Sequence, residues 1–339
     1  YKTCGGGFVF RGRKNLPIDI SSVIEQEYYE VETYIGNEPF SISRKDPIIT
    51  MIMRNSFDHL LVKEAQKFGI DVLQNHKLIG IENKDKHIIC KTSQGNIEAK
   101  FLIAADGVLS QTAKFAGWTT ETRNLIPALE YEVTVPEKDF DRLSKKARFD
   151  IDEAPEGYAW CFPKKNHLSL GVLTTRKKRI NLKEYYKSYL VKLGITEIIK
   201  EEQHGFQIPL SCRTDGFVKG RTFLIGDAAG FAEPITAEGI SNAIYSGKLV
   251  AKAIIESNLD LEMATKLYSE KLHKKLIPEL RSGEFLSNYF YKRNPVRNFL
   301  LKKYANKFGE YMVDILMGDK SFPMDVKKRL AQKIKEAVF

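Results

Sequence analysis

The fold is predicted mainly by one segment, Arg221-Thr-Phe-Leu-Ile-Gly-Asp-Ala-Ala-Gly-Phe-Ala-Glu-Pro-Ile-Thr-Ala-Glu-Gly-Ile240. Its apolar run, residues 222–225, predicts a buried strand that stops at Gly226-Asp227. The apolar-periodic residues 240–255 predict a helix that opens after Gly239. A helix N-terminus carries unpaired N–H groups and about half a positive charge, and an acid at a strand end can accept hydrogen bonds from ligand hydroxyls. The segment therefore indicates a site for a polyol-bearing, partly anionic cofactor, with an ordinary strand-turn-helix as the alternative.

The size and composition of the chain are those of a soluble globular protein. Its 339 residues are 43% hydrophobic and 28% charged, enough for one large domain or two interlocked ones. The sequence contains no run of about 18 apolar residues, so we expect no transmembrane helix. The four cysteines (Cys4, Cys90, Cys161 and Cys212) are scattered without paired or metal-binding spacing. We therefore expect a reducing, cytoplasmic location.

The charge balance is basic, with 53 Lys and Arg against 43 Asp and Glu, a net charge of +10. The basic clusters are Lys164-Lys165, residues 176–179, Lys274-Lys275, Lys302-Lys303 and residues 327–329. Such clusters are usually solvated faces, but a basic surface could also hold anionic lipid headgroups or a substrate diphosphate. They lack interleaved aromatic residues, so we expect no nucleic-acid partner. The six histidines show no metal-ligand spacing, and we expect no metal site.

The remaining pattern changes along the chain. Residues 1–50 are expected to be irregular. A strand (48–53), a helix (57–68), a short strand (70–73) and a hairpin (78–82 with 87–92) follow, then strands at 96–100 and 101–105. Antiparallel strands are expected at 129–135, 158–162 and 168–173, with a helix at 182–193. From residue 259 the pattern is helical, with Pro278, Pro295 and Pro323 as breaks.

Four further motifs combine small, charged or aromatic residues. Asp106-Gly107 follows the apolar strand 101–105, where open parallel sheets place their ligands. Arg54 lies between a strand and a helix, so its guanidinium could reach a cofactor or form a structural ion pair. Cys4-Gly-Gly-Gly7 allows a close backbone approach to a planar ring, or is a flexible tail. Period-2 spacing in residues 155–163 puts Tyr158, Trp160 and Phe162 on one face of a strand, as a wall for a hydrocarbon chain or as ordinary core.

Together these motifs resemble the geranylgeranyl reductase branch of the FAD-dependent oxidoreductases related to p-hydroxybenzoate hydroxylase. The match rests on G-D-A-A-G-x-x-x-P-x-x-x-E-G-I at residues 226–240, D-G-x-x-S at 106–110, R-x-x-F-D-x-x-L at 54–61, K-x-C-G-G-G at 2–7 and Y-x-W-x-F-P at 158–163. The resemblance implies FAD as cofactor and an enzyme that saturates isoprenoid double bonds of prenyl lipids by hydride transfer from reduced flavin. The electron donor stays open among a ferredoxin, a nicotinamide and a quinol, and the basic clusters together with a lipid substrate suggest peripheral membrane contact.

The resemblance also assigns residues. Asp227 would hold the ribityl chain, Gly239 and Ile240 would present the helix N-terminus to the flavin, and Pro234 and Thr236 would lie beside its ring. The other implied cofactor-binding residues are Arg54, Asp106, Gly107 and Gly226. Cys4 would belong to the catalytic site, and the implied substrate-binding residues are Gly5, Gly6, Tyr158, Trp160 and Phe162.

Two departures from the family pattern stand out. The basic residue of D-G-x-x-S-x-x-R is displaced or replaced, since Thr112 and Ala113 precede Lys114. The first flavin motif, G-x-G-x-x-G after a strand, is missing, so we expect a truncated chain that binds FAD weakly or folds poorly alone. Two alternatives remain open: a flavin monooxygenase or halogenase of the same fold, and a non-catalytic flavin- or lipid-binding protein.

The expected fold is α/β, with a Rossmann-like FAD-binding domain that lacks its first βαβ unit. The expected divisions are the first part of that domain (1–118), an inserted antiparallel-sheet substrate domain (119–212), the second part of the FAD-binding domain (213–258) and a C-terminal helical region (259–339).

Overall fold

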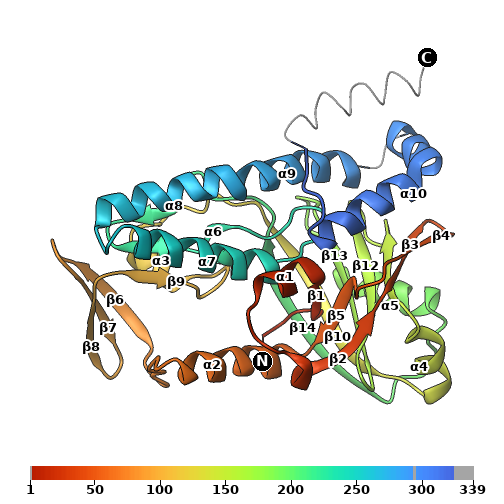
Figure 1. The fold of residues 1–339 in the computed structure, drawn as a ribbon. Coiled ribbons are helices and arrows are strands. Elements are labelled where there is room, and N and C mark those ends of the chain that lie inside the picture. Colours follow the sequence, from red (N-terminus) through yellow and green to blue (C-terminus); the bar gives the residue numbers. More distant parts are fainter. Residues whose placement is uncertain (1, 293–294, 324–339) are drawn as a thin grey trace. The chain divides into compact units, whose positions relative to one another are not determined.

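The computed structural model describes residues 2–292 and 295–323 (Figure 1). The chain forms two compact units, each assembled from separate segments. Unit 1 comprises residues 1–65, 126–207 and 285–339, and unit 2 comprises residues 66–125 and 208–284. The four-part domain division remains a prediction.

The largest element of unit 1 is a seven-stranded sheet with the order β14-β10-β13-β12-β11-β3-β4 (Figure 1). Its strands are β3 (Glu30–Ile35), β4 (Glu38–Ser43), β10 (Leu125–Thr134), β11 (Ala147–Ile151), β12 (Gly157–Pro163), β13 (Leu168–Thr174) and β14 (Lys200–Pro209). Strands β11 and β3 are parallel, whereas β10, β13, β12 and β11 follow one another antiparallel. This confirms the predicted antiparallel strands. Helix α5 (Leu182–Lys192) covers one face, where Tyr186 and Tyr189 join the apolar core.

The first fifty residues are regular rather than irregular, contrary to expectation. They form β1 (Gly7–Val9), α1 (Phe10–Asn15), the short 3₁₀ helix η1 (Ser21–Val23), β2 (Ile24–Tyr28) and then β3 and β4. A second sheet has the order β1-β5-β2, with β5 at Ile49–Ile52. Glutamates on β2 and β3 obscure the strand pattern, because acidic residues are depleted in strands. Here Glu30 and Glu32 are compensated by Lys146, at 2.9 and 3.2 Å.

Unit 2 is built around two paired parallel strands, β9 (Leu102–Ala104) and β16 (Thr222–Leu224), with β15 (Val218–Lys219) antiparallel to β16. The helical turn α6 (Gly226–Ala229) and the helices α7 (Ile240–Glu256) and α8 (Leu261–Lys275) follow, and α7 and α8 pack side by side (Figure 1). Their shared core includes Phe223, Leu249 and Tyr268. The predicted strand-turn-helix is thereby confirmed.

The rest of unit 2 contains the predicted hairpin. Strands β6 (Leu78–Asn83), β7 (Ile88–Thr92) and β8 (Gly95–Ala99) form an antiparallel sheet, and α3 (Gln111–Phe115) follows β9. The short strand predicted at residues 70–73 is wrong: these residues are irregular. Ile70 and Leu73 are 56% and 53% exposed, so their apolar side chains signal no buried strand.

The remaining helices are α2 (Arg54–Lys67), α4 (Glu137–Leu143), α9 (Ile277–Tyr291) and α10 (Pro295–Met317). They confirm the helical pattern after residue 259, as far as the chain is described. Pro278 and Pro295 lie at the starts of α9 and α10, where a missing N–H costs nothing. Among the described residues, no helix has both the length and the hydropathy needed to span a bilayer.

Candidate functional site

Two sequence-distant motifs meet at one edge of the small sheet in unit 2. Strands β9 and β16 are parallel with Ala104 opposite Leu224, and the Ile225 N–H donates to the Ala104 carbonyl at 3.2 Å. The Asp106-Gly107 loop and the Gly226-Asp227 turn therefore leave the sheet side by side. The carboxyl ends of parallel strands are where open α/β sheets bind ligands.

The Gly226-Asp227 turn requires glycine and is anchored to α7. Gly226 has φ +52°, and a Cβ there would lie 3.1 Å from the Ala243 Cβ. The Gly226 N–H donates to the buried Ser246 Oγ at 3.0 Å. The turn ends at Gly230, whose φ is +81°. Ser246 was not identified from the sequence, because a serine inside an apolar helix carries no motif.

Asp227 lies against the start of α7. A Cβ on Gly239 would be 3.1 Å from the Asp227 Oδ1, so the carboxylate passes close to the Gly239 backbone. Gly239 is the N-cap of α7 and supplies no side chain to bind the first-turn N–H groups. Both Asp227 and Gly239 are half-buried. A hydrogen-bond acceptor and a helix N-terminus thus occur together, as the sequence predicts.

The loop that connects α6 to α7 holds its own shape. The buried Glu233 carboxylate accepts hydrogen bonds from the Ile235 N–H at 2.9 Å and from the Thr236 N–H and hydroxyl at 2.6 Å each. Burial raises the pKa of Glu233, and these donors oppose the shift. Glu238 accepts from the Ser241 N–H in the first turn of α7 at 2.8 Å. Pro234 is buried in this loop and Thr236 is half-buried.

Asp106 shapes the neighbouring loop. Its carboxylate accepts hydrogen bonds from the Ser110 hydroxyl and from the Thr112 N–H, the latter at 2.9 Å. Ser110 in turn caps α3 by accepting from the Ala113 N–H at 2.9 Å. Gly107 has φ +81°, a left-handed conformation that favours glycine. Asp106 therefore has a role in loop geometry, and its assignment as a cofactor-binding residue remains a prediction.

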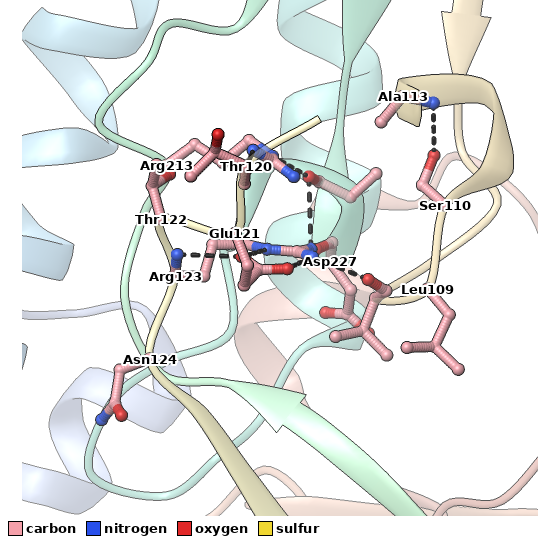
Figure 2. Close-up of polar contacts among 12 residues, drawn as sticks. Leu109, Ser110, Ala113, Thr120, Glu121, Thr122, Arg123, Asn124, Arg213 and Asp227 are labelled. Atoms are coloured by element: carbon pink, nitrogen blue, oxygen red, sulfur yellow. Dashed lines mark hydrogen bonds and ion pairs between the residues drawn. The ribbon is translucent and has the colours of Figure 1, made fainter. Parts of the chain in front are cut away.

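Arg123 ties the two loops together and was missed by sequence reasoning (Figure 2). Its buried guanidinium donates to the Val108 carbonyl at 2.7 Å in one loop and to the Asp227 carbonyl at 2.5 Å in the other. Glu121 accepts from the same guanidinium at 2.7 and 2.6 Å. This bidentate pair holds the fork in place and lowers the pKa of Glu121. The motif's missing basic residue gave no indication that an arginine further along the chain reaches these loops.

Arg213 supports the same turn. It is 7% exposed, its Nε donates to the Ala228 carbonyl at 3.3 Å, and its Nη1 donates to the Thr120 carbonyl at 3.2 Å (Figure 2). The Arg213 N–H also donates to the Ala229 carbonyl at 3.1 Å. The two buried cations thus bind the Asp227 and Ala228 carbonyls at the end of this four-residue helix, and the Asp227 carbonyl also accepts from the Gly230 N–H at 3.1 Å.

In unit 1 the structure brings the Cys4–Gly7 loop against strand β12. A Cβ on Gly5 would lie 2.9 Å from the Trp160 Nε1, and one on Gly7 would lie 3.1 Å from the Phe162 Cε2. Gly6 has φ +72°, and a Cβ there would lie 2.1 Å from the Ile52 carbonyl oxygen. The Ile52 N–H donates back to the Gly6 carbonyl at 2.9 Å. The loop is consequently packed, and the flexible-tail alternative is wrong.

The three aromatic residues of β12 share one face. The ring centroids of Tyr158 and Trp160 are 6.0 Å apart, and those of Trp160 and Phe162 are 6.2 Å apart. Phe149 of β11 contacts the Phe162 ring edge-on at 5.1 Å. Tyr158 and Trp160 are buried, whereas Phe162 is half-buried. These contacts show an aromatic layer against the glycine loop, and its role in substrate binding stays a prediction.

Arg54 is the first residue of α2 and lies in the same unit as Cys4. Its guanidinium makes a bidentate pair with Asp58 one turn later, at 2.9 and 2.8 Å. It also interacts with the Cys4 side chain. The ion pair that the sequence allowed is present, and it orients the guanidinium toward the loop; direct cofactor binding by Arg54 remains a prediction.

The site residues thus form two groups, one in each unit. Residues 106–107, 226–240 and Arg123 belong to unit 2, whereas Cys4–Gly6, Arg54 and the β12 aromatics belong to unit 1. Within the described part of the chain, no cluster of three or more His, Cys, Asp or Glu side chains could hold a metal ion. All four cysteines are free thiols.

Comparison with known proteins gives a consistent result. Residues 21–257 match the family model described as FAD binding domain. Geranylgeranyl diphosphate reductase of Arabidopsis thaliana chloroplasts is 28% identical over 92% of this chain and 71% of its own length. Digeranylgeranylglycerophospholipid reductase of Methanocaldococcus jannaschii is 30% identical, but the match covers 65% of this chain and 61% of that protein. This chain also superposes on a crystal structure of a geranylgeranyl bacteriochlorophyll reductase-like protein from Thermoplasma acidophilum, with a TM-score of 0.72 at 22% identity. The superposition covers 94% of this chain and 89% of that one, so the two proteins share the fold.

Proposed function

The chain belongs to the FAD binding domain family, and on that premise we propose that it is a FAD-dependent reductase that saturates isoprenoid double bonds of prenyl lipids. One observation carries the proposal: the Asp227 carboxylate and the N-terminus of α7 lie together at the carboxyl edge of two parallel strands. The names of the plant and archaeal relatives, which both specify geranylgeranyl groups, support the substrate class.

The residues at this edge suit the ribityl and ring portions of FAD. Asp227 can accept hydrogen bonds from ribityl hydroxyls. The N–H groups at the start of α7, of which the Ser241 N–H already binds Glu238, carry the partial positive charge that an electron-rich ring edge needs. Gly107 and Gly226 keep the approach free of side chains, and the buried Arg123 adds positive charge behind the turn. Pro234 and Thr236 complete the proposed cofactor side.

The Cys4–Gly6 loop and β12 form the proposed substrate side. An isoprenoid is an extended, branched hydrocarbon, and aromatic rings on one strand face provide apolar contact along such a chain. The half-buried Phe162 is the member of this layer that a bound lipid can reach most readily. We assign Gly5, Gly6, Tyr158, Trp160 and Phe162 to substrate binding and Cys4 to the catalytic site.

The chemistry divides between the cofactor and the chain. When bound, reduced FAD supplies the hydride for one alkene carbon. The chain must align the double bond, exclude water, and deliver a proton to the other carbon. An isolated alkene is a poor hydride acceptor, so a positioned proton donor lowers the barrier by neutralising the negative charge that hydride addition would leave on the second carbon. Cys4 is the proposed donor, because its thiol lies in the loop that the aromatic layer covers.

The partners follow from the same proposal. Reduced flavin must be regenerated by a ferredoxin, a nicotinamide or a quinol. Peripheral membrane contact would bring the chain to its lipid, and the exposed basic residues 176–179 and 274–275 support it through attraction to anionic headgroups. Flotation of the full-length protein with anionic liposomes should show binding at low salt that is lost at high salt. Equal flotation with neutral liposomes would contradict this contact.

The reductase proposal is tested with the full-length protein under anaerobic conditions. Its flavin is reduced chemically and then mixed with geranylgeranyl diphosphate or a geranylgeranyl lipid. We expect the flavin absorbance to return to that of the oxidised form, and the product to gain two hydrogen atoms per reduced bond by mass spectrometry. An Asp227→Asn variant should bind FAD more weakly.

Three results would overturn the proposal. Oxygen consumption coupled to hydroxylation of an organic substrate would identify a monooxygenase. Halide-dependent oxygen consumption would identify a halogenase. Binding of both FAD and prenyl lipid without reoxidation of the flavin would identify a binding protein.

A further inference from the structure

A fully buried lysine lies beneath the Cys4–Gly6 loop. Lys164, at the end of β12, is 2% exposed. Its Nζ donates to the Gly5 carbonyl at 2.6 Å and to the Ile52 carbonyl at 3.0 Å, and the ammonium interacts electrostatically with Cys4. The Lys164-Lys165 pair is therefore no solvated patch, since only Lys165 is exposed. Burial lowers the pKa of Lys164, which makes it easier for the ammonium to release a proton.

Two glutamates and a histidine continue from Lys164. Glu130 and Glu132, on the same face of β10, interact with each other and interact electrostatically with Lys164. Burial, with the negative charge of Glu132 next to it, raises the pKa of Glu130 to about 8. Ser169 donates to the Glu130 Oε1 at 3.0 Å, and Glu132 lies 3.0 Å from the Nε2 of His167.

The hairpin between β12 and β13 links both ends of this set. Lys164 and His167 flank the turn, and the Lys164 N–H donates to the His167 carbonyl at 2.8 Å. Lys164 extends inward to the glycine loop, whereas the His167 side chain is 17% exposed and so reaches solvent. The Lys164 cluster (Lys164, Glu130, Glu132 and His167) therefore runs from the surface to the Cys4 loop.

Such a cluster is costly as a purely structural device. Each ion taken out of water loses several kcal/mol of solvation (order of magnitude), and an apolar replacement is often as stable. Titratable groups whose burial and charge partners oppose one another concentrate at sites that move protons. The Lys164 cluster fits that description, and no part of the cofactor side uses it.

We propose that the Lys164 cluster is a proton relay that carries a proton from solvent at His167, through Glu132 and Glu130, to Lys164 and the Cys4 thiol. The proposal rests on the proposed reductase function for its purpose. The electrostatic linkage between the cluster and Cys4 is testable without cofactor or substrate.

Every proton in the proposed sequence of transfers has a donor and an acceptor. Saturation of one double bond adds a hydride to one carbon and a proton to the other. The Cys4 S–H bond breaks as that proton leaves, and the Lys164 ammonium returns a proton to the thiolate. The proton shared by Glu130 and Glu132 then passes to the Lys164 amine, His167 resupplies the carboxyl pair, and solvent reprotonates His167. No protein group changes its oxidation state.

The relay is surrounded by few other charges. Lys164 is also faced by Glu25 of β2, and Cys4 is also faced by Arg54 of α2. Glu132 is also faced by Glu202 of β14. Arg54 is permanently charged and both glutamates lie at the margins of the cluster, so the titrations of Glu130 and Lys164 should dominate the pH response.

The first experiment measures alkylation of Cys4 in the full-length protein across pH 5 to 10 (roughly the range in which these groups titrate), by peptide mass spectrometry. The thiolate is the reactive form. We expect the wild-type profile to require two ionisations because Cys4 is coupled to the cluster. Lys164→Met should slow alkylation at neutral pH by about tenfold, the effect of losing one adjacent cation. Lys165→Met removes the exposed neighbour and should leave the profile unchanged.

The second experiment uses Glu130→Gln, which retains the shape of the side chain but does not titrate. The alkylation profile should lose the ionisation that Glu130 contributes, and so should the pH dependence of flavin reoxidation by substrate. Glu137→Gln, on the exposed start of α4, is the matched control. His167→Gln should slow the reoxidation that follows the first turnover, since resupply from solvent is lost.

The outcomes are separable. If Glu130→Gln and His167→Gln leave the Cys4 profile and the reoxidation kinetics as in wild type, the relay is overturned, even if Lys164→Met fails to fold. If Cys4 is coupled to the cluster but reduced flavin never reacts with prenyl lipid, the reductase function fails while the linkage between the cluster and Cys4 stands.

Discussion

Replacement of Arg123 by methionine tests whether a buried cation holds the two cofactor loops in place. Methionine retains most of the apolar stem but removes every donor. The Val108 carbonyl loses its bond to Arg123 at 2.7 Å. The Asp227 carbonyl loses its bond at 2.5 Å but keeps one from the Gly230 N–H at 3.1 Å, and the Ala228 carbonyl keeps its bond from Arg213. The side chain is 3% exposed, so water does not readily replace the lost donors.

The magnitude follows from these contacts. A hydrogen bond to a charged group contributes about 1.5–3 kcal/mol, and two are lost, one of them from a carbonyl that keeps a backbone donor. The ion pair with Glu121 adds about 1 kcal/mol at most, because Glu121 is 41% exposed and therefore screened. We expect the free energy of unfolding to fall by about 3–5 kcal/mol, within the range for breaking a buried charged contact. Arg123→Lys should be intermediate, because one ammonium cannot reach both loops and Glu121.

The assay is urea unfolding of the full-length protein with and without FAD, followed by circular dichroism, with FAD affinity measured by fluorescence quenching. Arg142→Met is the matched control, because its ion pair with Asp139 is on the surface and should contribute less than about 1 kcal/mol. If Arg123→Met unfolds within about 1 kcal/mol of wild type and binds FAD equally well, the guanidinium does not hold the loops and the reasoning is refuted.

Three further predictions concern glycine and pH. Gly239→Ala should weaken FAD binding about tenfold, or ~1.4 kcal/mol, because the new Cβ would lie 3.1 Å from the Asp227 Oδ1. The control is Gly247→Ala inside α7, whose new Cβ would have its nearest contact at 3.7 Å and which should bind FAD normally. Gly6→Ala should lower the free energy of unfolding in urea far more than Gly36→Ala, because both residues have positive φ, costing about 1–2 kcal/mol, but only the Gly6 Cβ would meet another atom, the Lys164 Nζ at 2.0 Å. Equal losses in the two variants would refute the close approach. The pKa of Glu130 is raised to about 8 in the folded state, so the native state binds a proton that the unfolded state releases, and this group's contribution to stability is full below about pH 4.5 and is lost as pH rises toward 8. Glu130→Gln should flatten this decline in unfolding free energy, and an unchanged slope would contradict the assignment.

Local patterns account for what the sequence predicted correctly. The strand ending at Leu224, the turn at Gly226 and the helix from Ile240 each carry their own signals in periodicity and small residues. The aromatic spacing of β12 likewise needs only the period of a strand. Such features are encoded within a dozen residues, and the fold class followed from them.

The residues that the sequence did not identify act at long range. Arg123 lies in a polar loop with no motif, and its contacts to Val108 and Asp227 exist only after the loops meet. The sequence suggests that Lys164 and Lys165 are both surface lysines, and only the fold shows that the Gly5 and Ile52 carbonyls bind the Lys164 ammonium. The charged strands β2 and β3 were missed for a similar reason, because their glutamates are compensated by residues distant in the sequence: Arg13 pairs with Glu27 of β2, and Lys146 pairs with Glu30 and Glu32 of β3.

The two groups of site residues share one physical solution and differ in one property. Glycine-rich loops leave backbone carbonyls that no helix or sheet can pair, and a buried cation with several donors can satisfy them. On the cofactor side that cation is an arginine, Arg123, which stays charged at every accessible pH and so gives a fixed field next to Asp227. On the thiol side it is Lys164, whose ammonium can lose its proton when buried. A fixed charge suits a loop that must hold a cofactor, whereas a titratable one suits a loop that must release and regain a proton. Exchange of lysine for arginine at position 164 would therefore remove proton transfer even if the carbonyl contacts survived.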